Sequence, residues 1–300
     1  MKMNKSIFLT FFQIVMLAVA NIPASADTYN PPIMVEHKRS TSSNKSKELA
    51  QLLIQREAKV VYQCDDGICK KLIGEETPIL LTNNGTYPRW SPDGKWIAFV
   101  RGNTIMRMTA NGKKIQMMAR AIAPRAVAWT LDGRVIFTDG HVVKAVHSTT
   151  LTVETLITGP KFFEIDMVHS TKGDILAATV KTNFSYQVKI FDLKTGKKRT
   201  IARGCSASLS PDGRLVTVNT HNHKQLDLYQ AHSGIKKGHI NAPPRFKFDN
   251  HFWSTSQNWI VSQSEGKYAN IFVHHVPTNR VWQVTFTDNC NRPDLYIASN

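Results

Sequence analysis

Three histidines in the last third of the chain have the residue type and grouping of a metal site. One residue separates His221 from His223, and His251 ends the next polar stretch along the chain. Neutral imidazole nitrogens are common ligands of divalent metals, and Asp249 could add a carboxylate. The pattern is compatible with a divalent metal bound by His221, His223 and His251. So short a spacing is equally compatible with histidine rings that point into water and bind no metal.

Other common catalytic motifs are missing from the sequence. The chain has no nucleophile elbow, no glycine-rich loop that could hold phosphate, no calcium-binding loop and no Cys-x-x-Cys motif. No catalytic residue can therefore be assigned from motifs, and chemistry at this protein would depend on the histidines.

Two of the four cysteines flank a turn signal. Cys64 and Cys69 lie on either side of Asp66-Gly67, a dipeptide typical of a two-residue hairpin turn. In that hairpin Cys64 faces Cys69 directly, with Cα atoms about 4.5–5.5 Å apart, within the range of a disulfide. The sequence therefore predicts a Cys64–Cys69 disulfide, with a metal site of two cysteines and two aspartates as the alternative.

A recurring turn motif indicates which elements position these residues. The segment Tyr87 to Val100 reads Tyr-Pro-Arg-Trp-Ser-Pro-Asp-Gly-Lys-Trp-Ile-Ala-Phe-Val, a turn followed by a β-rich strand. Related turns follow at Thr130, Ser170, Ser210 and Ser254, so the spacings from Ser91 are 39, 40, 40 and 44 residues. A period of about 40 residues composed of strands and turns is typical of a β-propeller with one four-stranded blade per repeat.

The two ends of the chain together complete one blade. Residues 60–64, 68–72 and 79–82 predict three strands of a first blade that lacks its innermost strand. Asp294 to Ala298 matches the missing strand, because Pro293 takes the place of Pro88 in the repeat. The sequence therefore predicts an all-β, six-bladed propeller closed by its C-terminal strand.

The repeat unit resembles that of the TolB-like propeller family over roughly residues 58–298. The resemblance implies a six-bladed propeller located in the cell envelope or outside the cell. Similar propellers serve as envelope scaffolds, gating domains of peptidases and oligosaccharide lyases, so the fold alone does not assign a function. TolB itself has a folded domain before its propeller, for which the ~30 residues available in this chain are too few.

The register of the repeat assigns loops to faces of the ring. Second-to-third-strand hairpins and the connections between blades share one face, around the predicted funnel mouth, where the three histidines fall. Cys205 and Cys290 each precede an innermost strand on this face, two blades apart. An even cysteine count and an oxidising compartment favour a bond between this possible thiol pair, whereas the separation opposes it.

The N-terminal region has the features of an export signal. Lys2 and Lys5 precede an apolar run from Ile7 to Ala20, and Ala24-Ser25-Ala26 offers a cleavage site. We therefore expect a signal peptide at 1–26, a linker with a short helix at 27–58 and the propeller at 59–300. The helix would pack on the side of the propeller or serve as a docking arm. No second long apolar run exists, so we expect no transmembrane segment after cleavage and a periplasmic or secreted protein.

The charge is strongly positive and recurs at one repeat position. The formal net charge is +16, and in an exported chain this favours anionic glycan, lipid or acidic protein over nucleic acid. The cations fall where the third-to-fourth-strand turn enters the outer strand: Lys113, Lys114, Lys197, Lys198, Arg199, Lys236, Lys237 and Arg280. This register predicts a basic arc that binds an anionic surface.

These observations favour a non-enzymatic exported propeller that binds a protein partner or an anionic component of the envelope. The alternative is a metal-assisted lyase or hydrolase that acts on acidic oligosaccharide at the funnel mouth. A third class, a passive structural subunit of an envelope complex, would have neither metal nor ligand.

Overall fold

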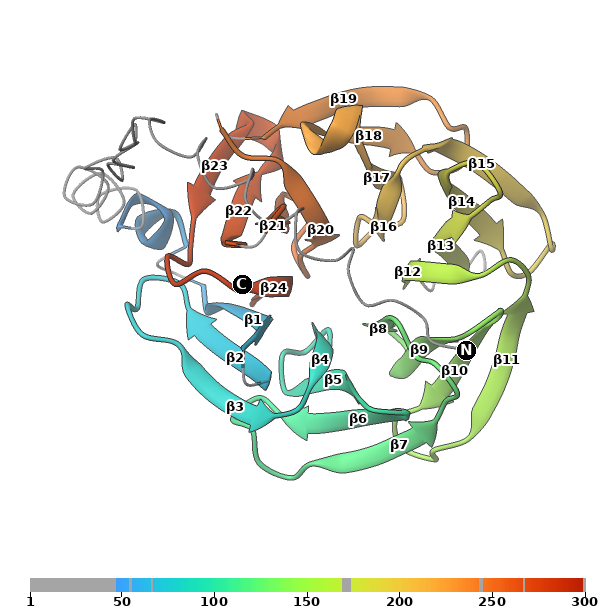
Figure 1. Cartoon of the computed structure of the whole chain (residues 1–300), viewed down its shortest axis with the longest axis horizontal. Coiled ribbons are helices and arrows are strands. Elements are labelled where there is room, and N and C mark those ends of the chain that lie inside the picture. The colour runs from blue at the N-terminus through green and yellow to red at the C-terminus, as the bar shows by residue number, and fades with distance from the viewer. Residues whose placement is uncertain are drawn as a thin grey trace, which may run out of the picture. The chain divides into compact units, whose positions relative to one another are not determined.

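The computed structural model describes residues 47–53, 56–65, 67–168, 174–242, 245–266 and 268–298. The predicted signal peptide and the linker as far as residue 46 lie outside these residues. Within them, 24 strands form six four-stranded antiparallel sheets arranged around one axis (Figure 1). The six-bladed propeller predicted from the repeat is confirmed.

The blades follow one another along the chain, and within each blade the strands are ordered from the axis outward. Blade one contains β24 (Asn291–Ile297), β1 (Ala58–Cys64), β2 (Gly67–Leu72) and β3 (Ile79–Asn83), and blade two contains β4 (Thr86–Trp90), β5 (Trp96–Arg101), β6 (Thr104–Thr109) and β7 (Gln116–Arg120). Blade three contains β8 (Val127–Trp129), β9 (Arg134–Asp139), β10 (Val142–His147) and β11 (Val153–Thr158), and blade four contains β12 (Phe162–Val168), β13 (Ile175–Lys181), β14 (Tyr186–Asp192) and β15 (Lys198–Arg203). Blade five contains β16 (Cys205–Leu209), β17 (Leu215–Thr220), β18 (Gln225–Gln230) and β19 (Lys236–Asn241), and blade six contains β20 (Phe248–Trp253), β21 (Trp259–Ser264), β22 (Ile271–His275) and β23 (Arg280–Gln283). Two short 3₁₀ helices, η1 (His221–His223) and η2 (Val276–Thr278), lie in blades five and six.

The ring closes as the sequence predicts. Strand β24 pairs antiparallel with β1, with Val60 opposite Leu295 and Val61 opposite Asp294. The last strand of the chain therefore completes the sheet that the first strands begin (Figure 1). This pairing covers the inner edge of β1, which would otherwise be open.

The hydrophobic core lies between neighbouring blades. Val60 and Leu295 of blade one pack with Val261 and Trp282 of blade six. Because each sheet is covered on both faces, middle strands such as β5 and β21 are buried along most of their length, whereas outer strands such as β3 are largely exposed. The axis is consequently lined by the six inner strands.

The repeated turn is held by its own side chains. The Ser91 hydroxyl donates to Asp93 Oδ1 at 2.6 Å and accepts from the backbone N–H of Trp96 at 2.9 Å. Gly94 has a φ of +66°, and a Cβ there would meet the Tyr296 ring at 2.4 Å. The motif thus specifies both the turn and the contact with the closing strand.

A short helix at residues 47–52 packs on the side of the propeller. Leu49 and Leu53 are buried in the core between blades six and one, while the Trp282 indole donates to Glu48 Oε2 at 3.0 Å. Arg280 forms an ion pair with the same carboxylate. These contacts match the packed helix expected from the sequence and occupy Arg280, one of the cations of the predicted arc.

Antiparallel meanders give the propeller two distinct faces. The turn face carries the first-to-second-strand turns, such as Ser91 to Gly94, and the third-to-fourth-strand turns. The link face carries the second-to-third-strand hairpins and the links between blades. Backbone hydrogen bonds connect a hairpin to the neighbouring link, as from the Lys181 N–H to the Lys161 carbonyl. The funnel mouth predicted from the sequence belongs to the link face.

Candidate binding site

Each of the three predicted metal ligands has a different set of neighbours. His221 Nδ1 lies 3.9 Å from Asp227 Oδ2, whereas His223 Nε2 lies 3.8 Å from the Cys205 sulfur. His251 is fully buried in β20. Across the part of the chain that the structure describes, no group of three or more His, Cys, Asp or Glu side chains is placed to hold a metal ion.

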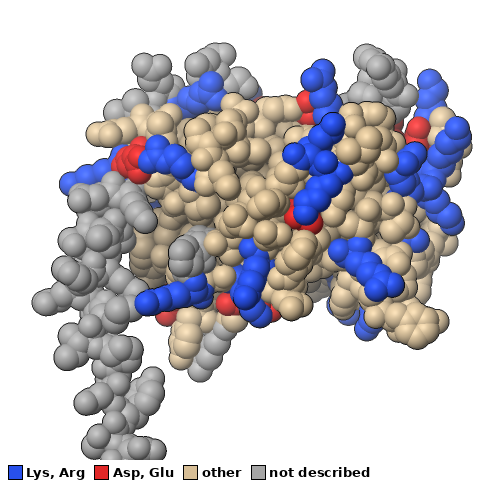
Figure 2. All heavy atoms as spheres, turned by 90° about the horizontal axis from the view of Figure 1, so that it is seen from above, with Lys and Arg blue, Asp and Glu red and all other residues tan. Residues whose placement is uncertain are grey.

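The predicted basic arc is only partly available for binding. Lys236 pairs with Asp227 at 2.7 Å, and Arg199 donates to the Ser233 carbonyl at 3.0 Å. Figure 2 views the propeller from the side on which β19 lies in Figure 1. In this view the blue Lys and Arg side chains are spread widely, and the red Asp and Glu side chains are few. The following exposed lysines have no ion pair with any described residue: Lys113, Lys114, Lys197, Lys198 and Lys237.

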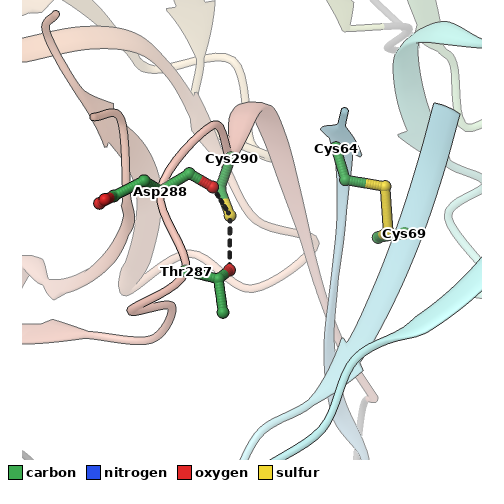
Figure 3. Close-up of a disulfide and its surroundings, with 5 residues drawn as sticks. All are labelled: Cys64, Cys69, Thr287, Asp288 and Cys290. Carbon is green, nitrogen blue, oxygen red and sulfur yellow. Dashed lines mark hydrogen bonds between the residues drawn. A yellow bond between two sulfur atoms is a disulfide. The ribbon is translucent and has the colours of Figure 1, made fainter. Parts of the chain in front are cut away.

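The Cys64–Cys69 disulfide is present, with a Cα–Cα distance of 5.8 Å (Figure 3). Its register differs from the prediction, because Cys64 faces Gly67 and Cys69 faces Tyr62. Gly67 lies inside β2, where a Cβ would meet the Thr82 carbonyl oxygen at 2.1 Å. The close approach of β3 requires this glycine, so the turn comes one residue earlier and the disulfide crosses the ladder diagonally.

The other two cysteines, Cys205 and Cys290, are free and form no disulfide with each other. Cys205 lies beside His223, and burial raises the pKa of its thiol to about 12, as do Glu164, Asp249 and Glu265. Cys290 is buried and donates to the Asp288 carbonyl, on the same side of blade one as the disulfide (Figure 3). A protonated thiol in an acidic environment is a poor nucleophile.

A central cavity of about 230 Å³ lies where the six inner strands meet. Pro92, Leu131 and Pro211 from first-to-second-strand turns line it, so it lies at the turn-face end of the axis. The register of the repeat had pointed to the link face, at the opposite end of the axis. Every blade contributes to the wall of the cavity, with charge supplied by Arg89, Asp166 and Asp294.

Backbone bulges precede the residues that reach this cavity. Tyr87, Ser206, Asn250 and Arg292 each have a positive φ in an inner strand, between 30° and 57°. A bulge changes the direction of the side chains that follow it. Two residues after three of these positions come Arg89, Phe252 and Asp294, and all three line the cavity.

The two cavity carboxylates tie neighbouring blades together. Asp166 accepts hydrogen bonds from the Ser208 hydroxyl at 2.9 Å and the Leu209 N–H at 2.8 Å. Asp294 accepts from the Trp90 N–H at 2.6 Å. Burial raises the pKa of Asp166 to about 6, because desolvation outweighs these donors.

Arg89 supplies a buried cation beside them. Its guanidinium carbon lies 3.3 Å from the centre of the Phe252 ring, and its Nη1 donates to the Pro88 carbonyl at 2.9 Å and the Pro293 carbonyl at 3.3 Å. Burial lowers the pKa of Arg89 to about 10, which leaves it charged at neutral pH.

Four buried donor atoms, all on residues that line the cavity, have no hydrogen-bond partner within the described part of the chain. They are the indole nitrogens of Trp90, Trp129 and Trp253 and Nε of Arg89. An unpaired buried donor costs about 1–3 kcal/mol, so a ligand in the cavity whose acceptors reach these atoms, after a small turn of the side chains, would recover this free energy. The wall is thus suited to carbonyl or carboxylate oxygens.

Sequence reasoning missed the cavity charges. The available signal was a charged residue inside an otherwise apolar inner strand, as in Pro88-Arg89-Trp90, Ile165-Asp166-Met167 and Pro293-Asp294-Leu295. A charge at such a position is rarely buried without a partner or a function.

The fold and the cavity define a six-bladed β-propeller with a polar central site. More narrowly, the fold is TolB-like: TolB from Acinetobacter baumannii superposes with a TM-score of 0.64 at 14% identity, covering 92% of this chain and 74% of that one. A structure assigned as TolB from Agrobacterium tumefaciens gives 0.63 at 12% identity, and nidogen in its complex with laminin gives 0.62 at 8%; each covers 81% of this chain and 98% of the other. No model of a known protein family and no curated protein matches the sequence. Among the described residues, no helix is long and apolar enough to cross a bilayer.

Proposed function

We propose that this chain is a non-enzymatic exported propeller that binds a protein partner through its turn face. A short segment of the partner enters the central cavity and offers oxygen acceptors to the indole and guanidinium donors of its wall. The observation that carries the proposal is that four residues lining one cavity have buried donors without a partner among the described residues. A similar propeller, that of nidogen, is known in complex with a protein, laminin.

Export is part of the same proposal. The basic, apolar and small-residue order of residues 1–26 supports it. The Cys64–Cys69 disulfide adds support, because disulfides persist mainly in oxidising compartments.

Replacing a cavity tryptophan by phenylalanine removes the indole N–H donor and keeps an aromatic ring at the position. We expect Trp129→Phe combined with Trp253→Phe to weaken partner affinity about thirtyfold, since each of the two lost hydrogen bonds is worth about 1 kcal/mol. Calorimetric titration of the partner, identified by cross-linking from the cavity rim, measures the effect. Trp259→Phe is the matched control, because Trp259 packs against Trp282 and His275 and does not line the cavity. Equal affinity of the double variant and the wild type would exclude the cavity as the site.

The exposed lysines of the outer edge support a second binding function, toward acidic glycan. We expect Lys197→Glu with Lys198→Glu to elute from an immobilised carboxylated polysaccharide at lower salt than the wild type, because many weak contacts are each screened over about 10 Å at 0.1 M salt. The control is Lys224→Glu with Arg245→Glu, an equal change of charge on the link face. Loss of retention in the control alone would place the glycan site elsewhere.

A further inference from the structure

The link face carries the exposed aromatic side chains of the described chain. Phe184 is 97% exposed at the tip of the hairpin between β13 and β14, and Ile122 is 84% exposed in the link between β7 and β8. Tyr268 and Phe286 are exposed on the same face in blade six and in the link from blade six to blade one. Within the described residues, none of the exposed aromatic side chains lies on the turn face.

The most exposed of these tips are held in place. Thr182 N–H and its hydroxyl both donate to the Ser185 carbonyl at 2.8 Å, and the Ser185 N–H donates to the Thr182 hydroxyl at 3.1 Å. The Ile122 N–H donates to Asp139 Oδ1 at 2.6 Å. Rigid loops that present apolar tips to solvent lose little conformational entropy on contact with a partner.

Cations surround the tips of blades three and four. Arg125 Cζ lies 5.4 Å and Lys161 Nζ 5.9 Å from the centre of the Phe163 ring, and Lys181 Nζ lies 5.9 Å from that of Tyr186. None of the three cations has an ion pair with a described carboxylate. More exposed cations lie on the same face at Arg203, Lys224 and Arg245.

The distribution of the tips identifies the kind of partner. They span the ring from the link before blade three to the link after blade six, so one partner must be broad and flat to contact them together. Apolar side chains among lysines and arginines match the boundary between the headgroups and acyl chains of an anionic bilayer. The exposed carboxylates of this face include Asp65 in blade one and Glu265 in blade six, whereas the tips Ile122 and Phe184 adjoin blades three and four, so contact is strongest over blades three and four.

We propose that the link face docks on the surface of an anionic membrane, with Phe184 and Ile122 inserted among the headgroups and Lys161, Lys181 and Arg125 close to lipid phosphates. In this orientation the turn face and its cavity point away from the membrane. The proposal rests on a different face from the protein-binding proposal, so either can hold without the other.

Co-sedimentation of the purified chain with vesicles tests the docking. We expect binding to phosphatidylglycerol–phosphatidylcholine vesicles and little binding to phosphatidylcholine alone. Phe184→Ser with Ile122→Ser should weaken binding on the order of tenfold, through loss of buried apolar surface. Lys161→Glu with Lys181→Glu should weaken it at least as much at low salt and remove most of its salt dependence. All variants should keep the wild-type urea midpoint, because these side chains are exposed.

Matched controls are Ile235→Ser, at an exposed position of the turn face outside the cavity, and Lys197→Glu with Lys198→Glu at the outer edge, which should bind as the wild type does. In addition, a Phe184→Trp variant should show a blue-shifted fluorescence difference spectrum with anionic vesicles, and Met117→Trp should not. The proposal is overturned if the wild type does not bind anionic vesicles at low salt. That is the result expected if the exposed tips bind only a protein. It is also overturned if the Phe184–Ile122 variant binds normally, or if the Lys197–Lys198 variant loses most binding.

Discussion

Removal of residues 291–300 is expected to abolish the folded propeller. The deletion takes away β24, whose Leu295 and Ile297 are buried between blades six and one and whose Asp294 accepts from the Trp90 N–H. Loss of a single buried leucine side chain costs about 2–5 kcal/mol, and domains are stable by about 5–15 kcal/mol, so loss of the whole strand exceeds what the ring can sustain.

The effect can be graded with point variants. Leu295→Ala should lower the free energy of unfolding by about 2–5 kcal/mol in urea titrations. Leu52→Ala, on the exposed side of the N-terminal helix, should change it by no more than about 0.5 kcal/mol. If the truncated chain unfolds cooperatively at the wild-type urea concentration, closure of the ring by β24 is not required for the fold.

Acid is expected to remove the stability contributed by two buried histidines of blade six. His251 and His274 are fully buried, and burial lowers the pKa of each to about 3. The unfolded chain takes up these protons below about pH 6.5, whereas the folded chain does not. Each histidine therefore contributes stability that is fully present above pH 6.5 and is lost as the pH falls toward 3, by about 1.4 kcal/mol per pH unit.

Other buried groups titrate with the opposite sign, so the comparison must be between variants. The folded pKa of Asp166, about 6, lies above its unfolded value, and its protonation adds stability as the pH falls through 6. We expect His274→Gln to be destabilised at pH 7.5, where the bond to Ser262 and the contact with Phe248 are altered. Its deficit relative to the wild type should shrink by about 2 kcal/mol between pH 7 and pH 5.

Urea unfolding at several pH values measures this difference. His232→Gln, at an exposed position of blade five, should run parallel to the wild type across the same range. Parallel curves for His274→Gln would show that the buried imidazole is not the source of the pH dependence.

What the sequence predicted correctly depends on local chemistry. The turn of Ser91, Asp93 and Gly94 is held by its own side chains, so its recurrence reveals the number of blades and the assignment of loops to faces. The pairing of the C-terminal strand also follows from the repeat. The first blade lacks its innermost strand in the N-terminal part of the sequence, and the C-terminal strand fills that one position.

What the sequence did not predict depends on distant contacts. The register of the disulfide is set by β3, whose backbone passes too close to Gly67 for any side chain. The backbone of η1 is also not evident from the local pattern, because His221, Asn222 and His223 all have positive φ. The cavity assembles from six inner strands that are distant in sequence, and no local pattern reports that Arg89, Asp166 and Asp294 meet there.

The central claim, that a protein partner enters the turn-face cavity, is tested most directly by photo-cross-linking in the cells that make the chain. A benzophenone side chain is placed at Leu131, which is exposed and lines the cavity, or at Met117, which is exposed on the outer strand β7. We expect one discrete cross-linked protein from position 131, none from position 117, and a marked loss of the product when Trp129 and Trp253 are both phenylalanine. Cross-linking that is equal from both positions, or unchanged by the two substitutions, would contradict the claim.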